Sequence, residues 1–254
     1  MSFTHDLKKT ARSVISFCIR QYKNTARLFL GRNVNENNFK SIPIIINNFN
    51  RLTYPLQLIQ RLEDWNYTNI YILDNNSSYP PLLEYYKTTQ HKVIQLKENM
   101  GYMALWDSDV YAQFRSSWYV YTDADVLPLQ SCGEDLLKDM MDILKKYPEI
   151  EKLGLALSIQ DLPDHYEHKQ KVIKLEKEYW EKPVEDGLYD AAVDTTFALY
   201  RPLAWGNADQ CKAFRLNGKY GAQHLPWYVN SQEPSEEEIY YQSHVSRNSS
   251  YWMN

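Results

Sequence analysis

The fold is decided by the stretch Trp118-Tyr119-Val120-Tyr121-Thr122-Asp123-Ala124-Asp125-Val126. Tryptophan, tyrosine and valine favour buried strands, so residues 117–122 are predicted to form an interior strand that ends at two aspartates. If the backbone stays extended through Asp125, side-chain alternation places the carboxylates of Asp123 and Asp125 on the same side, with Ala124 turned away. Two carboxylates at such a short distance resist joint ionisation unless a cation lies between them. Mg2+ and Mn2+ prefer oxygen ligands. The pair therefore predicts a divalent metal site, whereas the plainer alternative is a loop with two solvated aspartates.

Strands and helices alternate on both sides of this stretch. Strands are predicted at 42–46, 69–73, 92–96, 153–159 and 195–200, and helical segments at 53–65, 81–88, 106–114, 133–147 and 169–180. This alternation predicts an α/β fold with a mostly parallel central sheet flanked by helices. Residues 202–234 look irregular. A further helix is predicted to begin after Ser235, an N-cap residue with Glu238 at the third helical position.

Composition and charge limit the class of protein. The chain has 254 residues, 44% of them hydrophobic and 24% charged, which is typical of a soluble globular protein. Three distant cysteines match no disulfide or zinc pattern, so a reducing, cytoplasmic setting is favoured. No apolar run approaches the ~20 residues needed to cross a bilayer. After residue 40 the chain carries 20 Lys/Arg against 30 Asp/Glu, a net charge of −10, which argues against a general nucleic-acid binder.

Residues 1–40 form a basic helical segment and a linker. This segment carries eight Lys/Arg against two Asp/Glu, a net charge of +6, and residues 4–30 have the apolar spacing of a basic amphipathic helix. Such a helix can make peripheral contact with an anionic membrane, which would place the protein at the inner face of that membrane. The alternative is that the apolar face packs on the protein's own core or on a partner subunit. Residues 41–254 are predicted to form a single domain.

Polar residues follow each early strand at its carboxyl end. In a parallel sheet these ends share one edge, so residues 47–51, 74–77 and 99–101 are expected to line one crevice with the aspartate pair. Asp74 can accept a hydrogen bond from a base N–H. Because the chain has no glycine-rich phosphate loop, a metal at Asp123 and Asp125 is expected to neutralise the diphosphate of a nucleotide.

A family resemblance follows from these motifs. They are Ile44-Ile45-Ile46-Asn47-Asn48-Phe49-Asn50-Arg51, Ile72-Leu73-Asp74-Asn75-Asn76-Ser77, Asn99-Met100-Gly101 and Thr122-Asp123-Ala124-Asp125. Together they resemble the nucleotide-sugar-dependent glycosyltransferases with the Rossmann-like A-type fold, most like glycosyltransferase family 2. The resemblance covers about residues 41–130 and extends more loosely to about 230. It implies a nucleotide-binding half at 41–130 and an acceptor-side half at 131–254.

The resemblance also implies roles for individual residues. Residues from Asn48 to Arg51, together with Asp74, are expected near the base, and Asn99 and Gly101 near the ribose and base. Asp123 and Asp125 are expected to hold Mn2+ or Mg2+ and the diphosphate. The full set expected to bind the nucleotide sugar is Asn48, Asn50, Arg51, Asp74, Asn76, Asn99, Gly101, Asp123 and Ala124.

Two further roles lie in the second half of the chain. The sequence His224-Leu225-Pro226-Trp227 resembles the late histidine motif that supplies a metal ligand in several A-type enzymes, so His224 is expected to join the metal site. An inverting transferase also needs a general base for the acceptor hydroxyl. Asp194 is the first candidate, followed by Asp190 and Asp161. The acidic pair in which family 2 often places this base is missing, so inversion is only weakly favoured over retention.

The sequence thus favours a metal-dependent glycosyltransferase. Its donor is expected to be a UDP- or GDP-linked sugar and its acceptor a glycan or lipid-linked molecule, as in the synthesis of surface polysaccharides. Two alternatives stay open. One is a metal-dependent nucleotidyltransferase that acts on a sugar phosphate, and the other is a non-catalytic module that binds nucleotide sugars.

Overall fold

The strand at the centre of the sequence prediction, β4 (Tyr119–Asp123), lies inside a large sheet. A computed structural model describes residues 2–31, 34–194, 196–206, 211–230 and 233–245. The other strands are β1 (Ile44–Asn48), β2 (Ile70–Asp74), β3 (Lys92–Gln95), β5 (Val126–Pro128), β6 (Lys152–Leu157), β7 (Pro183–Glu185), β8 (Leu188–Asp190), β9 (Ala198–Tyr200) and β10 (Ala213–His224). The helices are α1 (Ser2–Arg27), α2 (Thr53–Asp64), α3 (Pro80–Thr88), α4 (Ala104–Asp107), α5 (Tyr111–Phe114), α6 (Leu136–Lys146), α7 (Lys169–Glu178) and α8 (Glu236–His244). Of the predicted segments, linker residues 32–33 and strand residue 195 fall outside these ranges.

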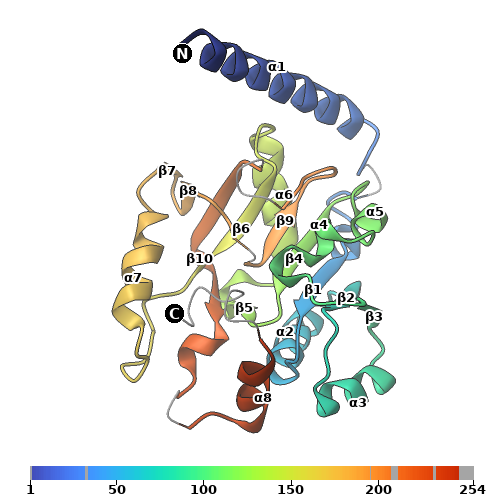
Figure 1. Ribbon diagram of the computed structural model, residues 1–254, viewed down its shortest axis with the longest axis vertical. Helices are drawn as coiled ribbons and strands as arrows, with labels where there is room; N and C mark the ends of the chain where they lie inside the picture. Colours follow the sequence, from blue (N-terminus) through green and yellow to red (C-terminus); the bar gives the residue numbers. More distant parts are fainter. Residues whose placement is uncertain (1, 32–33, 195, 207–210, 231–232, 246–254) are drawn as a thin grey trace.

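The sheet is mixed, with the strand order β3-β2-β1-β4-β9-β6-β10-β8-β7 and with β5 paired to β10 (Figure 1). Strands β1 to β4 run parallel, as the alternation of strands and helices predicts. The prediction of a mostly parallel sheet is wrong beyond β4, because β9 runs antiparallel to both β4 and β6. Strands β5, β7 and β8 also pair antiparallel. Only residues 186–187 join β7 to β8, and a parallel pairing needs a far longer crossover.

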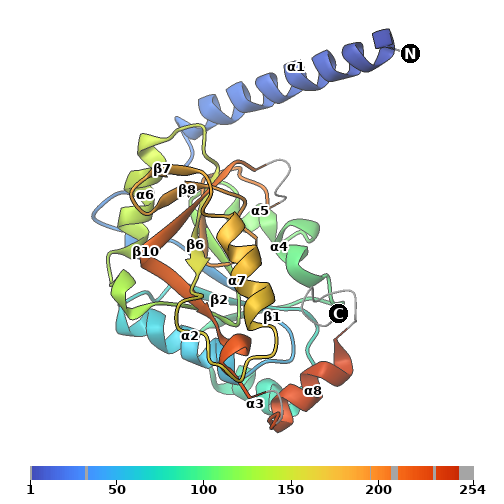
Figure 2. The same ribbon diagram turned by 90° about the vertical axis from the view of Figure 1, so that its left-hand side faces the viewer.

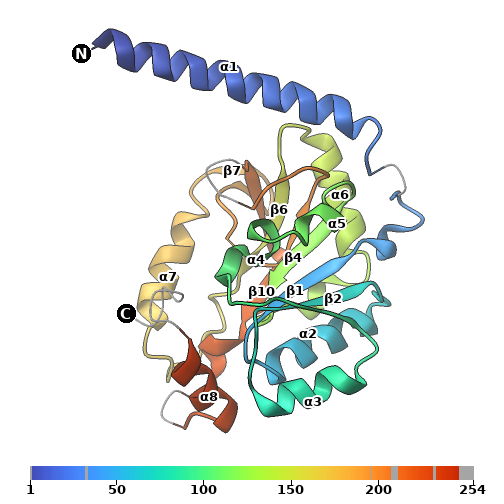
Figure 3. The ribbon, with the colours of Figure 1, turned by 45° about the vertical axis from the view of Figure 1, so that its right-hand side comes forward.

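Both faces of the sheet are buried, and β4 contributes to each. Val120 packs in one core with Leu58 of α2 and Met140 of α6. Tyr119 and Tyr121 point to the opposite face, where Trp106 of α4 packs against them. Figure 3 shows α2 and α4 on opposite sides of the β1 ribbon. Burying one large apolar side chain contributes roughly 1.5–3 kcal/mol, so this two-sided packing holds the carboxyl end of β4 in a fixed place.

Helix α1 extends away from the rest of the molecule in all three ribbon views (Figures 1, 2 and 3). Lys23 and Arg27 near its end pair with Glu151 at 3.2 and 2.6 Å, and Arg27 Nε donates to the carbonyl of Pro202. Ile15 and Tyr22 on its apolar face are 58% and 70% exposed. The part of α1 whose side chains are described therefore does not pack on the protein's own core. Among the described helices, none combines the length and apolar character needed to span a membrane.

Candidate active site

The carboxyl end of β4 brings Asp123 beside the end of β1. Asp123 pairs in register with Asn47, whose Nδ2 lies 3.4 Å from Asp123 Oδ1. The strand ends at Asp123, and Ala124 and Asp125 form a turn that leads into β5. The prediction that the backbone stays extended through Asp125 is therefore wrong. A turn, rather than strand alternation, sets the direction of the second carboxylate.

This turn places Asp125 beside His224, the last residue of β10. Strands β5 and β10 pair antiparallel with Val126 opposite His224, and the backbone N–H of Leu225 donates to the carbonyl of Asp125 at 2.9 Å. As a result, His224 Nε2 lies 3.5 Å from Asp125 Oδ2. About a hundred residues separate Asp125 and His224 in the sequence, and the β5–β10 pairing brings the two side chains together.

The Asp125–His224 pair contains ligand atoms without hydrogen-bond partners. Asp125 Oδ1 and His224 Nδ1 are both buried and accept or donate no hydrogen bond. Burial lowers the pKa of His224, the charge of Asp125 opposes this shift, and the charge of Arg51 adds to it. A neutral imidazole keeps a lone pair that can bind a metal. Within the described ranges, no group of three or more His, Cys, Asp or Glu side chains is close enough to hold a metal ion, so Asp125 and His224 form a pair of potential ligands rather than a complete metal centre.

Arg51 lies next to this pair, on the loop that follows β1. Its guanidinium forms an ion pair with Glu238 of α8 and lies 3.6 Å from the ring centroid of Tyr241 and 5.1 Å from that of Tyr54. Burial raises the pKa of both tyrosines to about 12, and the negative charge of Asp125 contributes to both shifts. Arg51 therefore lies at the edge of the sheet where β1 and β4 end. Nothing in the sequence pattern indicates Tyr54, Tyr241 or Glu238 as its neighbours.

Asparagine side chains tie the ends of the early strands together. Asn75 Nδ2 donates to Asn47 Oδ1 at 2.6 Å and to the carbonyl of Gly101 at 3.2 Å. Asn99 Oδ1 accepts from the N–H of Gly101. The carboxyl ends of β1, β2 and β4 thus meet at one edge, as predicted. Asn47 and Asn75 make the connecting contacts, although the sequence analysis did not include either in the set expected to bind the nucleotide.

Several side chains that were predicted to lie near the base form hydrogen bonds within the protein. Asp74 is 1% exposed, and its two oxygens accept hydrogen bonds from the hydroxyl of Tyr86 and the N–H of Ser77. Asn48 Nδ2 donates to the carbonyl of Arg51. Asn50, which is 0% exposed and has a positive φ of 52°, accepts hydrogen bonds from two backbone N–H groups of residues 78–79. These side chains shape the two loops, while Asn76 and Asn99 are exposed at their surface.

The three candidate bases occupy different places. Asp194 is exposed and lies on the segment that leads into β9, whose first residue, Ala198, pairs with Tyr121 of β4. Tyr200, whose pKa burial raises far above its ordinary value, also feels the charges of Asp194 and Asp123, so both carboxylates lie within electrostatic range of one side chain. Asp190 lies on β8, with three strands between it and β4, which is roughly 19 Å at ~4.8 Å per strand. The structure does not bring Asp190 to the aspartate pair.

Asp161 lies near the end of β10 but is engaged in hydrogen bonds. Its carboxylate accepts from Ser158 Oγ at 2.7 Å, from Tyr228 at 2.8 Å and from Gln223 Nε2 at 3.1 Å. These bonds outweigh burial and lower the pKa of Asp161. A carboxylate stabilised in its ionised form is a weak base, so Asp161 is better suited to holding the loop around His224.

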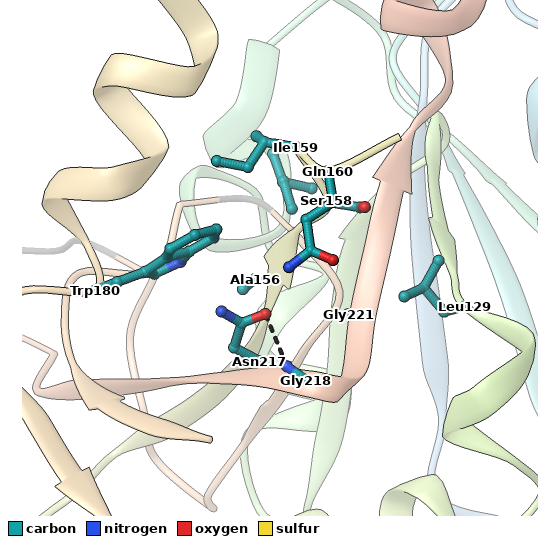
Figure 4. A pocket seen from close by; sticks show the side chains of 10 residues that line it. Leu129, Ala156, Ser158, Ile159, Gln160, Trp180, Asn217, Gly218 and Gly221 are labelled. Carbon is teal, nitrogen blue, oxygen red and sulfur yellow. Dashed lines mark hydrogen bonds between the residues drawn. The ribbon is translucent and has the colours of Figure 1, made fainter. Parts of the chain in front are cut away.

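A small cavity of about 50 Å³ lies between the carboxyl end of β6 and the middle of β10. Figure 4 shows the amide ends of Gln160 and Asn217 pointing toward the same space, with the indole of Trp180 at one side. The residues that line this cavity are all uncharged. It is therefore unsuited to a diphosphate and is distinct from the Asp125–His224 pair.

Comparisons with known proteins find similarity among solved structures. No protein-family model and no curated protein sequence matches it. Among solved structures, S. aureus TarS 1–349 in complex with UDP has 13% sequence identity and a TM-score of 0.41, and the match covers 70% of this chain and 59% of that fragment. GalNAc-T7 with UDP, GalNAc and Mn2+ has 11% identity and a TM-score of 0.44, covering 72% of this chain and 43% of that one. UDP-glucose pyrophosphorylase complexed with UDP-glucose has 10% identity and a TM-score of 0.45, covering 80% and 100%.

These neighbours differ in length and chemistry. The match spans only about half of the TarS and GalNAc-T7 chains. All three structures contain UDP or UDP-glucose, and that of GalNAc-T7 also contains Mn2+.

Proposed function

We propose that the chain is a metal-dependent glycosyltransferase. It transfers a sugar from a UDP- or GDP-linked donor to a glycan or lipid-linked acceptor. The observation that carries this proposal is the partly buried Asp125–His224 pair, which lies at the carboxyl edge of the parallel strands. Donor binding belongs to residues 41–130 in this proposal, and acceptor binding to residues 131–254.

The donor set of the pair suits Mn2+ or Mg2+. Carboxylate oxygen and neutral imidazole nitrogen are both ligands for Mn2+, and a cation would compensate the buried Asp125 Oδ1, which has no hydrogen-bond donor. Asp123, at the end of β4, is the third proposed ligand, and its side chain would have to move toward the pair to complete the set, because the three are not grouped closely enough in this structure. When bound, such a cation stabilises the negative charge of the departing diphosphate.

The chain's own residues supply the rest of the chemistry. Asp194 is the proposed general base, which takes the proton of the acceptor hydroxyl while its oxygen attacks the anomeric carbon and the bond to the diphosphate breaks. This arrangement gives inversion. Its support is that Asp194 is exposed on the segment that leads into β9, the strand beside β4, whereas Asp190 is several strands away.

The proposed location is the cytoplasmic face of an anionic membrane, where α1 makes the contact. Its support is the exposed apolar side chains of α1 and the net charge of +6 on residues 1–40, where eight Lys/Arg stand against two Asp/Glu. A lipid-linked acceptor would be held in the same membrane.

A thermal-shift panel of nucleoside diphosphate sugars, with and without Mn2+, tests the proposed function. A ligand present at 100 times its Kd stabilises the folded state by about 2.7 kcal/mol. One of the donors should therefore raise the Tm of the wild type in the presence of Mn2+. Asp125→Asn should lose this shift, because it removes a metal ligand, while the exposed Asp109→Asn should keep it.

Product analysis separates the proposal from its alternatives. Release of nucleoside diphosphate during transfer supports a glycosyltransferase, and release of pyrophosphate points to a nucleotidyltransferase. A normal Mn2+-dependent shift in Asp125→Asn would overturn the proposed site.

A further inference from the structure

Helix α8 packs on the loops that follow β1 and β2. Glu237 accepts hydrogen bonds from the backbone N–H of Thr53 at 3.0 Å and from its hydroxyl at 2.9 Å, so it caps the first turn of α2. The hydroxyl of Tyr240 donates to the carbonyl of Ser78 at 3.0 Å. In each ribbon view α8 lies at the end of the molecule where α2 and α3 are found (Figures 1 to 3). The helix thus covers the crevice edge in which we place the donor.

Arg51 is the residue that α8 covers most closely. Its side chain is 8% exposed and that of its partner Glu238 is 18% exposed, so this ion pair is largely shielded from water. The ring of Tyr241, on the same helix, lies over the guanidinium at 3.6 Å. One turn of α8 therefore supplies both the counter-charge and the cover of Arg51.

The position of Arg51 matches the phosphate end of a donor better than the base end. Arg51 follows β1, and the end of β1 pairs with β4 at Asn47 and Asp123, so Arg51 lies at the same edge of the sheet as the carboxylates. A guanidinium presents the same fork of N–H donors to a carboxylate and to a phosphate. The carboxylate of Glu238 is therefore an anion that a phosphate group could replace on Arg51.

We infer that Arg51 binds the diphosphate of the donor, and that Glu238 holds this position until a donor arrives. This inference rests on the proposed function and assigns Arg51 to the phosphate rather than to the base. Binding of a nucleoside diphosphate exchanges one anion for another on Arg51 and releases α8 from the crevice. Since only molecules with α8 released bind the donor, the apparent affinity is lower than the intrinsic affinity by the fraction released.

Calorimetric titration of the full chain tests this exchange. The ligands are UDP and GDP, each with Mn2+, and the nucleosides uridine and guanosine. Glu238→Gln removes the competing charge and should tighten binding of the preferred diphosphate about tenfold. The matched control is Glu236→Gln, which makes the same change of charge in the exposed first turn of α8 and should bind like the wild type. Arg51→Gln should weaken the binding of the diphosphate by about tenfold or more, as expected when a charge-assisted contact is lost. None of these variants should change the affinity of the nucleosides, which carry no phosphate.

Hydrogen exchange of the wild type gives a second measurement that needs no variant. The amides of α8 should exchange faster when the diphosphate and Mn2+ are added. Slower exchange in α8, or a Glu238→Gln variant that binds like Glu236→Gln, would overturn the inference while leaving the proposed function intact. If the wild type binds neither diphosphate, the proposed function fails together with the inference.

Discussion

At the scale of single residues, the site contains a carboxylate that is costly to the fold. A buried oxygen without a hydrogen-bond donor costs about 1–3 kcal/mol, and Asp125 Oδ1 is such an atom. Proteins tend to keep costly groups of this kind where function needs them. Asp161 lies on the loop that follows β6. It shows the opposite arrangement, since its carboxylate accepts three hydrogen bonds. The two aspartates therefore differ in what they contribute to stability.

The lowered pKa of Asp161 predicts how this contribution depends on pH. A carboxyl group whose pKa is lower in the folded state than its ordinary value of 3.8 stabilises the fold fully above that value, and this stabilisation is lost as the pH falls through the folded-state pKa. Asp161→Asn should therefore be less stable than the wild type at pH 6, by up to about 1 kcal/mol because the group is partly exposed to solvent. The difference should shrink toward pH 2.5.

Urea unfolding between pH 2.5 and 6 measures this difference, with the exposed Asp109→Asn as the control for the loss of one carboxylate. A constant gap between the wild type and Asp161→Asn over the whole range would show that the hydrogen bonds of Asp161 do not favour its ionised form.

At the scale of elements, the sequence predicted the strands of the first half well. The runs that become β1, β2 and β4 are apolar and end in polar residues, and their parallel order follows from the helices between them. The edge shared by Asn47, Asp74 and Asp123 could therefore be predicted. The direction of Asp125 could not, because a turn at Ala124 and Asp125 leaves no trace in the alternation of side chains.

The second half shows where the sequence pattern is insufficient. Residues 202–234 were expected to be irregular, and this prediction is wrong because they contain β10. The strand was hidden by the interruption around Asn217 and Gly218, where the pairing with β6 shifts register and Gly218 has a positive φ of 74°. The start of α8 was predicted correctly, since Ser235 accepts a hydrogen bond from the N–H of Glu238. Its contact with Arg51 could not be predicted, because acidic residues in a first helical turn are already favoured by the helix dipole.

Packing between β6 and the segment before β9 gives a prediction about how Asp194 is held. A Cβ added at Gly154 of β6 would lie 2.3 Å from Val193 Cγ1, and Val193 directly precedes Asp194. Gly154→Ala should therefore destabilise the protein by about 1–3 kcal/mol through overpacking. Because the added methyl group enters the space that the Val193 side chain fills, the double variant Gly154→Ala/Val193→Ala should lose less stability than the sum of the two single variants.

A double-mutant cycle by urea unfolding measures this coupling. A coupling of at least ~0.5 kcal/mol is expected for residues in contact. Additive effects of the two substitutions would show that the chain before β9 is not fixed by β6, and the place of Asp194 would then lose its structural support.

At the scale of the whole molecule, charge and hydrophobicity are divided between two regions. Residues 1–40 carry eight Lys/Arg against two Asp/Glu, and the rest of the chain carries 20 against 30. The described apolar side chains of α1 lie in the solvent, while the sheet has apolar cores on both faces. A basic amphipathic helix on an acidic body is attracted to an anionic surface, while the body itself is repelled. This division orients the molecule with α1 toward the membrane.

Sedimentation with lipid vesicles tests this orientation. The wild type should sediment with vesicles that contain phosphatidylglycerol more than with neutral phosphatidylcholine vesicles, and less at 0.5 M salt than at 0.1 M, because each basic residue near the surface contributes about 1 kcal/mol that salt screens. Val14→Asp/Ile15→Asp replaces two side chains that are 56% and 58% exposed and should abolish sedimentation. The control is Ile239→Asp on α8, a similar change at a side chain that is 55% exposed, and it should sediment like the wild type.

If the helix instead pairs with a second copy, the wild type will sediment as a dimer without vesicles and the α1 variant as a monomer. That result would contradict the membrane contact, because the apolar face of α1 would then already be covered.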